Sequence, residues 1–359
     1  MERMAVLFRS TSCAKPNPVK GFYTALAMFL PLLVLTMLGQ RAFGVLVMTG
    51  ALLTSFGDPG TSSRKQAWLL GMTAVGGTLM TALGRLIGGP WWVEVVEIFL
   101  VVFFGGLLSV YGRVAAVMGL LLTIPFVVSL ANRSGPATAL PAAGGFLLGG
   151  AILMLFALLF ARLPLPRSTP GNDVRPNRSQ PPPTTLPALL ALPSPLLRFS
   201  LLRAVGAAVA AGSGWILGGP PFYWATLTVI IGTEQDQKSS LRKALQNVVA
   251  TYLGALLAGV VLAGVQNALV LELIIVAITF LAFTIKDLNY FLYFFFFTIL
   301  ILLLISIRLP GQSLAVWRVV TILFGAGIVL VNTFLCQLSF FKERKGVPPS
   351  KEVEGAEHD

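Results

Sequence analysis

Long hydrophobic stretches alternate with short polar segments along the whole chain of 359 residues. A stretch of about 17–25 apolar residues is long enough to cross a lipid bilayer as a helix. The sequence predicts six such segments in each half of the chain, and we therefore expect an all-α membrane protein with about 12 transmembrane helices. The predicted segments are 21–39, 42–57, 66–88, 91–111, 113–131, 138–161, 199–218, 221–233, 240–264, 268–285, 288–307 and 312–341.

Composition supports this reading and narrows the function. Hydrophobic residues make up 56% of the chain and charged residues 11%, against roughly 25% charged in soluble domains, so a soluble globular enzyme is excluded. Two cysteines and one histidine cannot form a disulfide framework or a thiolate metal site. We find no phosphate loop and no nucleophile triad. The sequence therefore predicts no enzyme activity, no metal and no cofactor.

The polar segments divide the chain into parts. Residues 163–198 hold ten prolines, too many for a continuous helix, and they predict an extended cytoplasmic linker. The apolar run within residues 1–20 is too short for a secretory signal, so we expect an N-terminal tail there. The remaining parts are a first six-helix unit over 21–162, a second over 199–341 and a tail over 342–359.

The two halves repeat each other at a fixed offset. Six pairs of identical polar or glycine residues are each separated by 178 positions, at equivalent points of the two six-helix units. We interpret this as a duplication into two parallel six-helix repeats related by an axis along the membrane normal. The pairs are Asp58 and Asp236, Arg64 and Arg242, Lys65 and Lys243, Gly76 and Gly254, Glu94 and Glu272, and Gly149 and Gly327.

Basic residues set the expected orientation. With 12 spans both termini lie on one side, and 21 of the 26 lysines and arginines fall on that side. The positive-inside rule places it in the cytoplasm. This bias explains most of the net charge of +12 without nucleic acid. The expected partners are the lipid bilayer and a substrate, and a homo-oligomer or an accessory export subunit stays an open alternative.

The second segment of each half is short, which is the best sequence indication of a transporter's binding site. One ends at Asp58 and the other leads into Asp236, and each is followed by serines and a basic pair. A serine that caps the next helix, together with the basic pair, would attract anions. The alternative is a pair of cytoplasmic anchors that follow the positive-inside rule. The basic pairs are Arg64 with Lys65 and Arg242 with Lys243.

Charged residues near or inside the spans supply further candidates. Arg318 lies within an apolar segment and should face a cavity or a partner, although snorkelling from the outer end is the alternative. For Arg203 we favour snorkelling. Asp58, Asp236, Glu94 and Glu272 are candidate proton sites or gates, but no acid is evident at the membrane midplane. Trp224 and Tyr223 could stack on an aromatic ligand or belong to the interfacial aromatic belt.

The second half resembles a known family. FYWATLT, SSLRKALQNVVATYLGALLAG and WRVVTILFG are similar to motifs of the fusaric acid resistance family, which overlaps the aromatic acid exporters and is similar to the plant aluminium-activated malate transporters. The residues that match the family pattern are Tyr223, Trp224, Leu227, Thr228, Ser240, Arg242, Thr251, Gly254, Arg318 and Gly325.

The resemblance implies an exporter of small organic or aromatic anions in a bacterial inner membrane, with Tyr223, Trp224, Thr228 and Arg318 on the anion path. Asn247 and Ala250 stand where the family usually has Arg and Gly. A large cytosolic helical region found in fuller members is replaced by the proline linker. A passive anion channel on the same scaffold and a membrane scaffold that transports nothing are the two alternative functions.

Overall fold

The computed structural model describes nine stretches of the chain, all built from helices and short connections. These stretches are 16–58, 63–87, 90–131, 135–162, 195–217, 223–233, 237–265, 267–308 and 314–346. Within them no strand occurs, and the all-helical prediction is confirmed. The predicted tails over 1–15 and 347–359 and most of the predicted linker, 163–194, lie outside the described residues.

Twelve α-helices correspond in order to the twelve predicted segments. They are α2 (Pro18–Met37), α3 (Arg41–Ser55), α4 (Ser63–Leu86), α5 (Trp91–Leu107), α6 (Arg113–Ala131), α7 (Ala139–Ala161), α9 (Pro195–Leu217), α10 (Tyr223–Gly232), α11 (Gln237–Gly264), α12 (Ala268–Ile285), α13 (Tyr290–Arg308) and α14 (Leu314–Gly346). Two short 3₁₀ helices, Leu108–Tyr111 and Pro136–Thr138, join neighbours. Eight of these helical segments are long and apolar enough to cross a membrane, and four are shorter apolar helices.

Local sequence explains where the first helix begins and ends. The side chain of Asn17 accepts a hydrogen bond from the backbone amide of Lys20 at 3.0 Å, and Pro18 occupies the first helical position, where its missing N–H costs nothing. Gly39, with φ of 74°, makes the turn into α3, a backbone conformation that a residue with a Cβ rarely adopts. The Asn17 cap and the Gly39 turn therefore set the two ends of α2.

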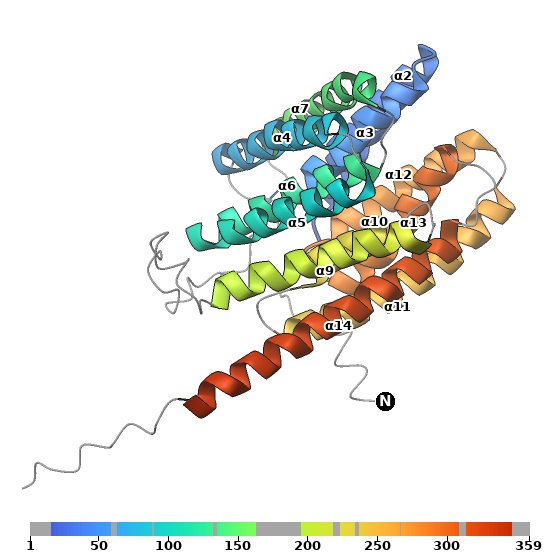
Figure 1. Cartoon of the computed structure of the whole chain (residues 1–359). Coiled ribbons are helices and arrows are strands. Elements are labelled where there is room, and N and C mark those ends of the chain that lie inside the picture. Colours follow the sequence, from blue (N-terminus) through green and yellow to red (C-terminus); the bar gives the residue numbers. More distant parts are fainter. Residues whose placement is uncertain are drawn as a thin grey trace, which may run out of the picture.

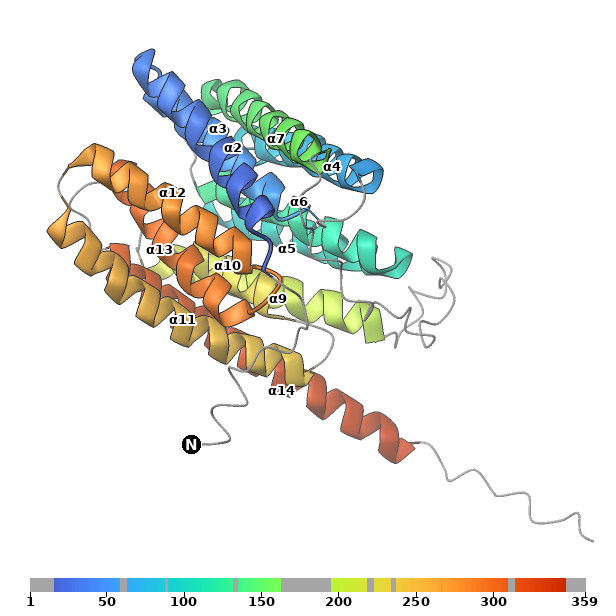
Figure 2. The ribbon, with the colours of Figure 1, turned by 180° about the vertical axis from the view of Figure 1, so that it is seen from behind.

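The twelve helices form two groups that lie side by side (Figures 1 and 2). In the first group α3 packs on α7, α4 on α6 and α7, and α5 on α6. The second group has the same pairs at corresponding positions: α10 with α14, α11 with α13 and α14, and α12 with α13. The groups meet where α5 contacts α9 and where α12 contacts α2, which are again corresponding pairs.

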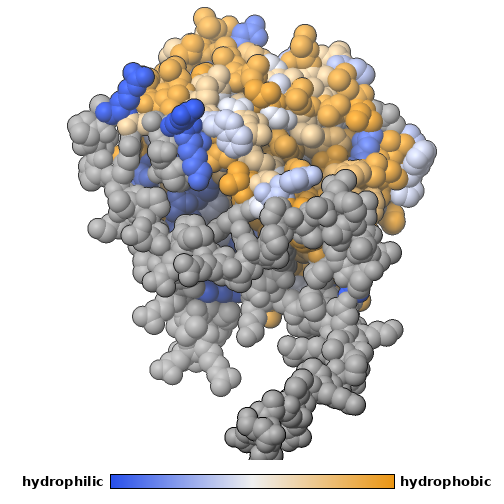
Figure 3. Space-filling model, turned by 90° about the vertical axis from the view of Figure 1, so that its left-hand side faces the viewer, coloured by the Kyte–Doolittle hydropathy of each residue, from blue (hydrophilic) through white to orange (hydrophobic). Residues whose placement is uncertain are grey.

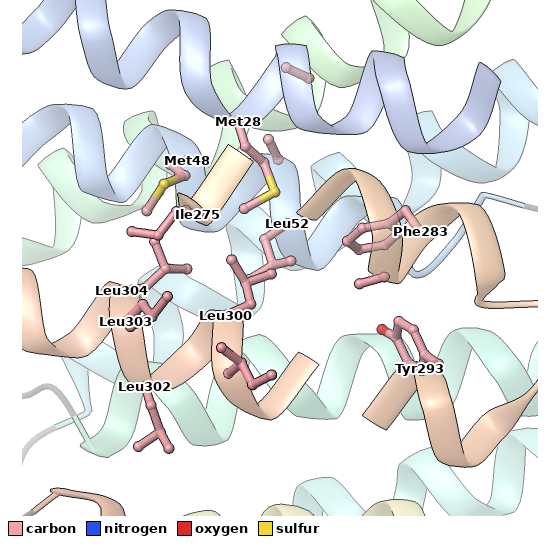
Figure 4. Packing of buried hydrophobic residues seen from close by; sticks show 14 of the residues in the cluster. Met28, Met48, Leu52, Ile275, Phe283, Tyr293, Leu300, Leu302, Leu303 and Leu304 are labelled. Atoms are coloured by element: carbon pink, nitrogen blue, oxygen red, sulfur yellow. The ribbon is translucent and has the colours of Figure 1, made fainter. Parts of the chain in front are cut away.

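The interior and the surface of the bundle are both apolar. Met28 of α2 and Leu52 of α3 belong to one buried cluster with Leu300 of α13, at the junction of the two groups (Figure 4). Large hydrophobic side chains such as Leu140 and Val260 are exposed, and such residues cover most of the described surface on the face shown in Figure 3. A soluble monomer rarely exposes so much apolar surface. An apolar surface of this extent is stable in contact with lipid. The chain is therefore a multi-pass membrane protein.

Small residues allow close approach between helices, as expected where lipid rather than water surrounds the bundle. A Cβ added to Gly149 of α7 would collide with the carbonyl oxygen of Val47 and lie 2.6 Å from the amide nitrogen of Ala51 in α3. A Cβ added to Gly327, which is 178 positions further on, would meet no atom within 4 Å. The two positions therefore form a matched pair for testing the packing.

Gly149→Ala is expected to destabilise the purified chain by about 1–3 kcal/mol, because overpacking a tight contact forces the helices apart. Gly327→Ala should leave stability unchanged or slightly raised, since alanine favours the helix. Thermal unfolding of both variants in one detergent checks this. Equal melting temperatures for the two variants would contradict the close packing of α3 against α7.

Candidate functional site

A cavity of about 570 Å³ lies between the two groups of helices. Its wall comes mainly from the corresponding helices α3 with α10 and α6 with α13, and α11, α14 and the loop after α12 complete it. The volume is in the range of about 300–1,000 Å³ that is usual for small-molecule sites. On α13 the lining residues extend from Tyr293 to Ile305, about 18 Å of helix at 1.5 Å per residue. The cavity therefore follows the helix axes.

The cavity extends between the two ends of the helix bundle. We call the end of the bundle where α2 begins and α14 ends the tail end, and the opposite end the far end. Most of the wall is apolar, and charged side chains mark it near both ends. Among the described residues that line it, Arg318 and Lys286 are basic and none is acidic.

Arg318 lies one helical turn inside the start of α14, towards the far end. Its side chain is 7% exposed, and the guanidinium carbon lies 4.5 Å from the centre of the Trp224 ring. Within the described part of the chain, its Nε has no hydrogen-bond partner. The hydroxyl of Thr228 donates to the carbonyl of Trp224 at 2.8 Å and so stays on α10. A buried cation with an unused donor thus borders the cavity.

A polar cluster at the tail end ties three helices of the first group to the loop between α12 and α13. The Tyr23 hydroxyl and Gln66 both donate to the carboxylate of Asp58, the Gln66 bond at 2.8 Å. The ammonium of Lys20, which is 1% exposed, donates to the backbone carbonyl of Asp58 at 3.1 Å. It also pairs with Asp287 at 3.0 Å.

Lys286 in the same loop faces both this cluster and the cavity. Its ammonium donates to the carbonyls of Ser55 at 3.2 Å and Phe56 at 3.3 Å, at the end of α3. It also lies 5.2 Å from the ring centre of Phe56. Burial lowers the pKa of Lys286 to about 7; the positive charge of Lys20 acts in the same direction, while Asp287 and Asp58 oppose it. Protonation of Lys286 therefore changes close to neutral pH.

The pKa of Asp287 moves in the direction that its neighbours dictate. Burial acts to raise it, but the positive charges of Lys20 and Lys286 outweigh burial and lower it. Asp287 therefore stays ionised at neutral pH and keeps its ion pair with Lys20.

At the C-terminal ends of α3 and α10, backbone carbonyls accept hydrogen bonds from a cation of another element. At the end of α3 this cation is Lys286, and at the end of α10 it is Arg203 of α9, whose Nη2 donates to the carbonyl of Ile230 at 2.5 Å. A positive charge at a helix C-terminus offsets the helix dipole and unused carbonyls. Arg203 is 8% exposed, so the snorkelling interpretation of this residue was wrong.

The two basic pairs predicted from the sequence lie away from the cavity. Arg64 and Lys65 are exposed in the first turn of α4. Arg242 is half-buried on α11, and the ammonium of Lys243 lies 5.3 Å from the centre of the Tyr290 ring. Since α11 begins at Gln237, the serines at 239 and 240 lie inside the helix, and the prediction that they precede and cap it was wrong.

The three predicted acidic residues that the structure describes, Asp58, Glu94 and Glu272, each have different neighbours. Asp58 belongs to the tail-end cluster, and Asp236 lies outside the described residues. Glu94 of α5 accepts a hydrogen bond from the Trp215 indole at 3.2 Å, and Glu272 of α12 lies 3.8 Å from the guanidinium of Arg41. Both of these contacts join the two groups of helices, and neither glutamate lines the central cavity.

The sequence predicted the lining residues near the far end of the cavity but not those near the tail end. Tyr223, Trp224, Thr228 and Arg318 all line it. The position of Lys286 at the cavity was not predicted, although a Lys-Asp pair between two apolar segments was a visible signal. Lys20, Tyr23 and Gln66 carried no such signal, because they reach partners up to 267 positions away.

The fold and the cavity define a helical multi-pass membrane protein with a basic site between two groups of six helices. Residues 204–332 match the family model described as fusaric acid resistance protein-like, which confirms the resemblance that the sequence motifs of the second half indicated. Comparison with curated proteins found no significant match. Comparison with solved structures found none either.

Proposed function

We propose that this chain is a transporter that exports small organic or aromatic carboxylate anions across a bacterial inner membrane, with both termini in the cytoplasm. The observation that carries the proposal is the buried guanidinium of Arg318 at the cavity, with its Nε unpartnered among the described residues. A guanidinium is planar and can hold a carboxylate by two parallel hydrogen bonds. Burial of this cation is costly unless a partner arrives.

The charge of the cavity wall favours an anion. Arg318 and Lys286 are its basic residues, and no carboxylate lies among the described residues that line it. In a medium of low dielectric constant, cations that border a cavity without acidic lining residues attract an anion strongly. A cationic substrate would meet repulsion from both.

The apolar part of the wall suits an organic substituent. Tyr293 and Phe297 of α13 stack with ring centres 5.7 Å apart, and Phe297 is 5.6 Å from the ring of Phe56 on α3. Trp224 also lines the cavity, with its ring centre 4.5 Å from the guanidinium carbon of Arg318. Such rings offer faces for aromatic or aliphatic groups, which supports an organic acid over a small inorganic anion.

The proposal includes two parallel six-helix repeats. The recurrence of the helix pairs at corresponding positions supports a duplication, as does the origin of the cavity wall from α3 with α10 and α6 with α13. Transporters built from such repeats bind their substrates at the repeat interface. The location of the cavity agrees with this rule.

Export of an anion can run on the membrane potential alone. A potential of 100 mV, negative inside, drives one negative charge outward by about 2.3 kcal/mol. The alternative is a passive anion channel on the same scaffold, which the same basic cavity would serve. A membrane scaffold that transports nothing is the other alternative, and it would not explain why the Nε of Arg318 lies buried at the cavity without a hydrogen-bond partner among the described residues.

Flux measurements on the purified chain in liposomes test the proposal. Radiolabelled benzoate is the probe, and a potassium gradient with valinomycin sets the potential at a fixed pH. We expect potential-driven flux that saturates with benzoate concentration. Unitary currents in planar bilayers would favour the channel instead, and benzoate flux equal to that of empty liposomes would refute transport of this class.

A further inference from the structure

The two basic residues of the cavity lie at opposite ends. Lys286 lies in the loop just before α13 begins at the tail end, and Arg318 lies in the second turn of α14 near the far end. The lining part of α13 between these levels is about 18 Å long at 1.5 Å per residue. This length along the helix axis is large compared with a small organic acid. Each cation therefore has its own surroundings.

Lys286 has a donor left for a ligand. Its ammonium carries three N–H groups, and among the described residues it donates to two carbonyls, those of Ser55 and Phe56. Lys20 differs, because it pairs with Asp287 and does not line the cavity. Arg203, which binds the end of α10 as Lys286 binds the end of α3, does not line it either. Binding a helix end therefore does not by itself require a place at the cavity.

We propose that Lys286 forms a second anion-binding site at the tail end of the cavity, which takes the carboxylate of an organic anion separately from Arg318. The inference rests on the proposed function and extends it from one cationic site to two. In the cytoplasmic orientation proposed above, the Lys286 site meets the substrate first and the Arg318 site meets it last.

Aromatic rings beside the ammonium fit an aromatic carboxylate. The ammonium of Lys286 lies 5.2 Å and 5.7 Å from the ring centres of Phe56 and Phe283, and Phe283 packs edge-on against Tyr293 at 6.1 Å. A carboxylate that accepts the third N–H would place its ring against Phe56 and Tyr293, which line the cavity and which Phe283 supports from behind. The chemical class expected at this site is a monocarboxylate with a flat apolar body.

Binding of benzoate to the full-length chain in nanodiscs tests the inference. The dissociation constant follows from the rise in melting temperature with benzoate concentration, measured at pH 6 for the wild type and for Lys286→Gln. Glutamine keeps a donor for the α3 carbonyls and removes the charge. We expect benzoate to bind Lys286→Gln about 10-fold more weakly, since a hydrogen bond to a charged group is lost. Arg162→Gln, which removes an exposed cation at the same end, should bind like the wild type.

The pH dependence supplies a second readout that a structural role would not change. Charged groups that face Lys286 are Lys20 from α2, Asp58 after α3 and Asp287 in its own loop. Between pH 6 and pH 8 Lys286 loses its proton while benzoate stays ionised, so wild-type affinity should fall by up to about 10-fold. Lys286→Arg keeps its charge throughout and should show a flat profile.

The outcomes separate this inference from the proposed function. A wild type that binds benzoate as tightly as Lys286→Gln, with Arg318→Gln impaired, would overturn the second site and leave the transporter standing. A wild type without any saturable response to benzoate would overturn both. If Lys286→Gln does not fold, a sloping pH profile in Lys286→Arg would still refute the proposal.

Discussion

Arg318→Gln is expected to reduce saturable benzoate flux by about 10- to 100-fold at unchanged membrane abundance. Glutamine keeps much of the bulk and some hydrogen bonding but removes the charge that borders the cavity beside Trp224. A hydrogen bond to a charged group contributes about 1.5–3 kcal/mol, which corresponds to this range of fold-change. Insertion into the membrane should be unaffected or slightly easier. Flux normalised to the amount of folded protein in liposomes is the measurement.

Arg318→Lys separates a binding role from an anchoring role. Lysine keeps a point charge but lacks the planar fork that holds a carboxylate by two bonds, so we expect partial flux between that of the wild type and Arg318→Gln. A residue that only anchors the helix at the interface would work equally well as lysine. Unaltered flux in Arg318→Gln at wild-type abundance would remove Arg318 from the anion path.

Asp58→Ala is expected to destabilise the purified chain by about 3 kcal/mol, seen as a fall of several degrees in melting temperature. The carboxylate is 5% exposed and accepts hydrogen bonds from Tyr23 and Gln66. Its removal leaves the Tyr23 and Gln66 donors unsatisfied and takes away a negative charge that acts on Lys286. Helices α2, α3 and α4 would then lose their common contact at the tail end.

Asp58→Asn is the matched control for this prediction. Asparagine can accept from Gln66 and donate to the Tyr23 hydroxyl, so its melting temperature should stay close to that of the wild type. Flux in this variant then tests the gate role of Asp58 without confusion from unfolding. Wild-type flux would show that Asp58 has a structural role alone. Loss of flux at an unchanged melting temperature would support its predicted role as a proton site or gate.

The amino-acid sequence by itself determined the helices and showed that lipid surrounds them. Twelve apolar segments predicted twelve helices to within a few residues, because a helix in lipid must be apolar along a known length and end where polar residues begin. The larger differences lie at the ends: α9 begins at Pro195, inside the predicted linker, and α14 continues to Gly346, beyond the predicted boundary at 341. Polar helix ends carry no hydropathy signal that fixes their last residue.

Part of the site was also visible in the sequence. Arg318 and Trp224 stood out because a charge inside an apolar segment and a motif shared with a family are local signals. The basic pairs Arg64 with Lys65 and Arg242 with Lys243 were equally conspicuous, yet they lie off the cavity. The positive-inside rule, on which their predicted cytoplasmic position rests, concerns the membrane surface and says nothing about which side chains face inward.

Only the tertiary structure decided which polar groups meet. The ammonium of Lys286 reaches carbonyls of α3 that lie 230 and 231 positions earlier in the chain, and Lys20 pairs with Asp287 across 267 positions. Hydropathy and spacing report on neighbours within a helix, whereas contacts between helices depend on how the two groups pack. The helices were thus determined locally, while the cavity and its second cation arose from the way the two halves come together.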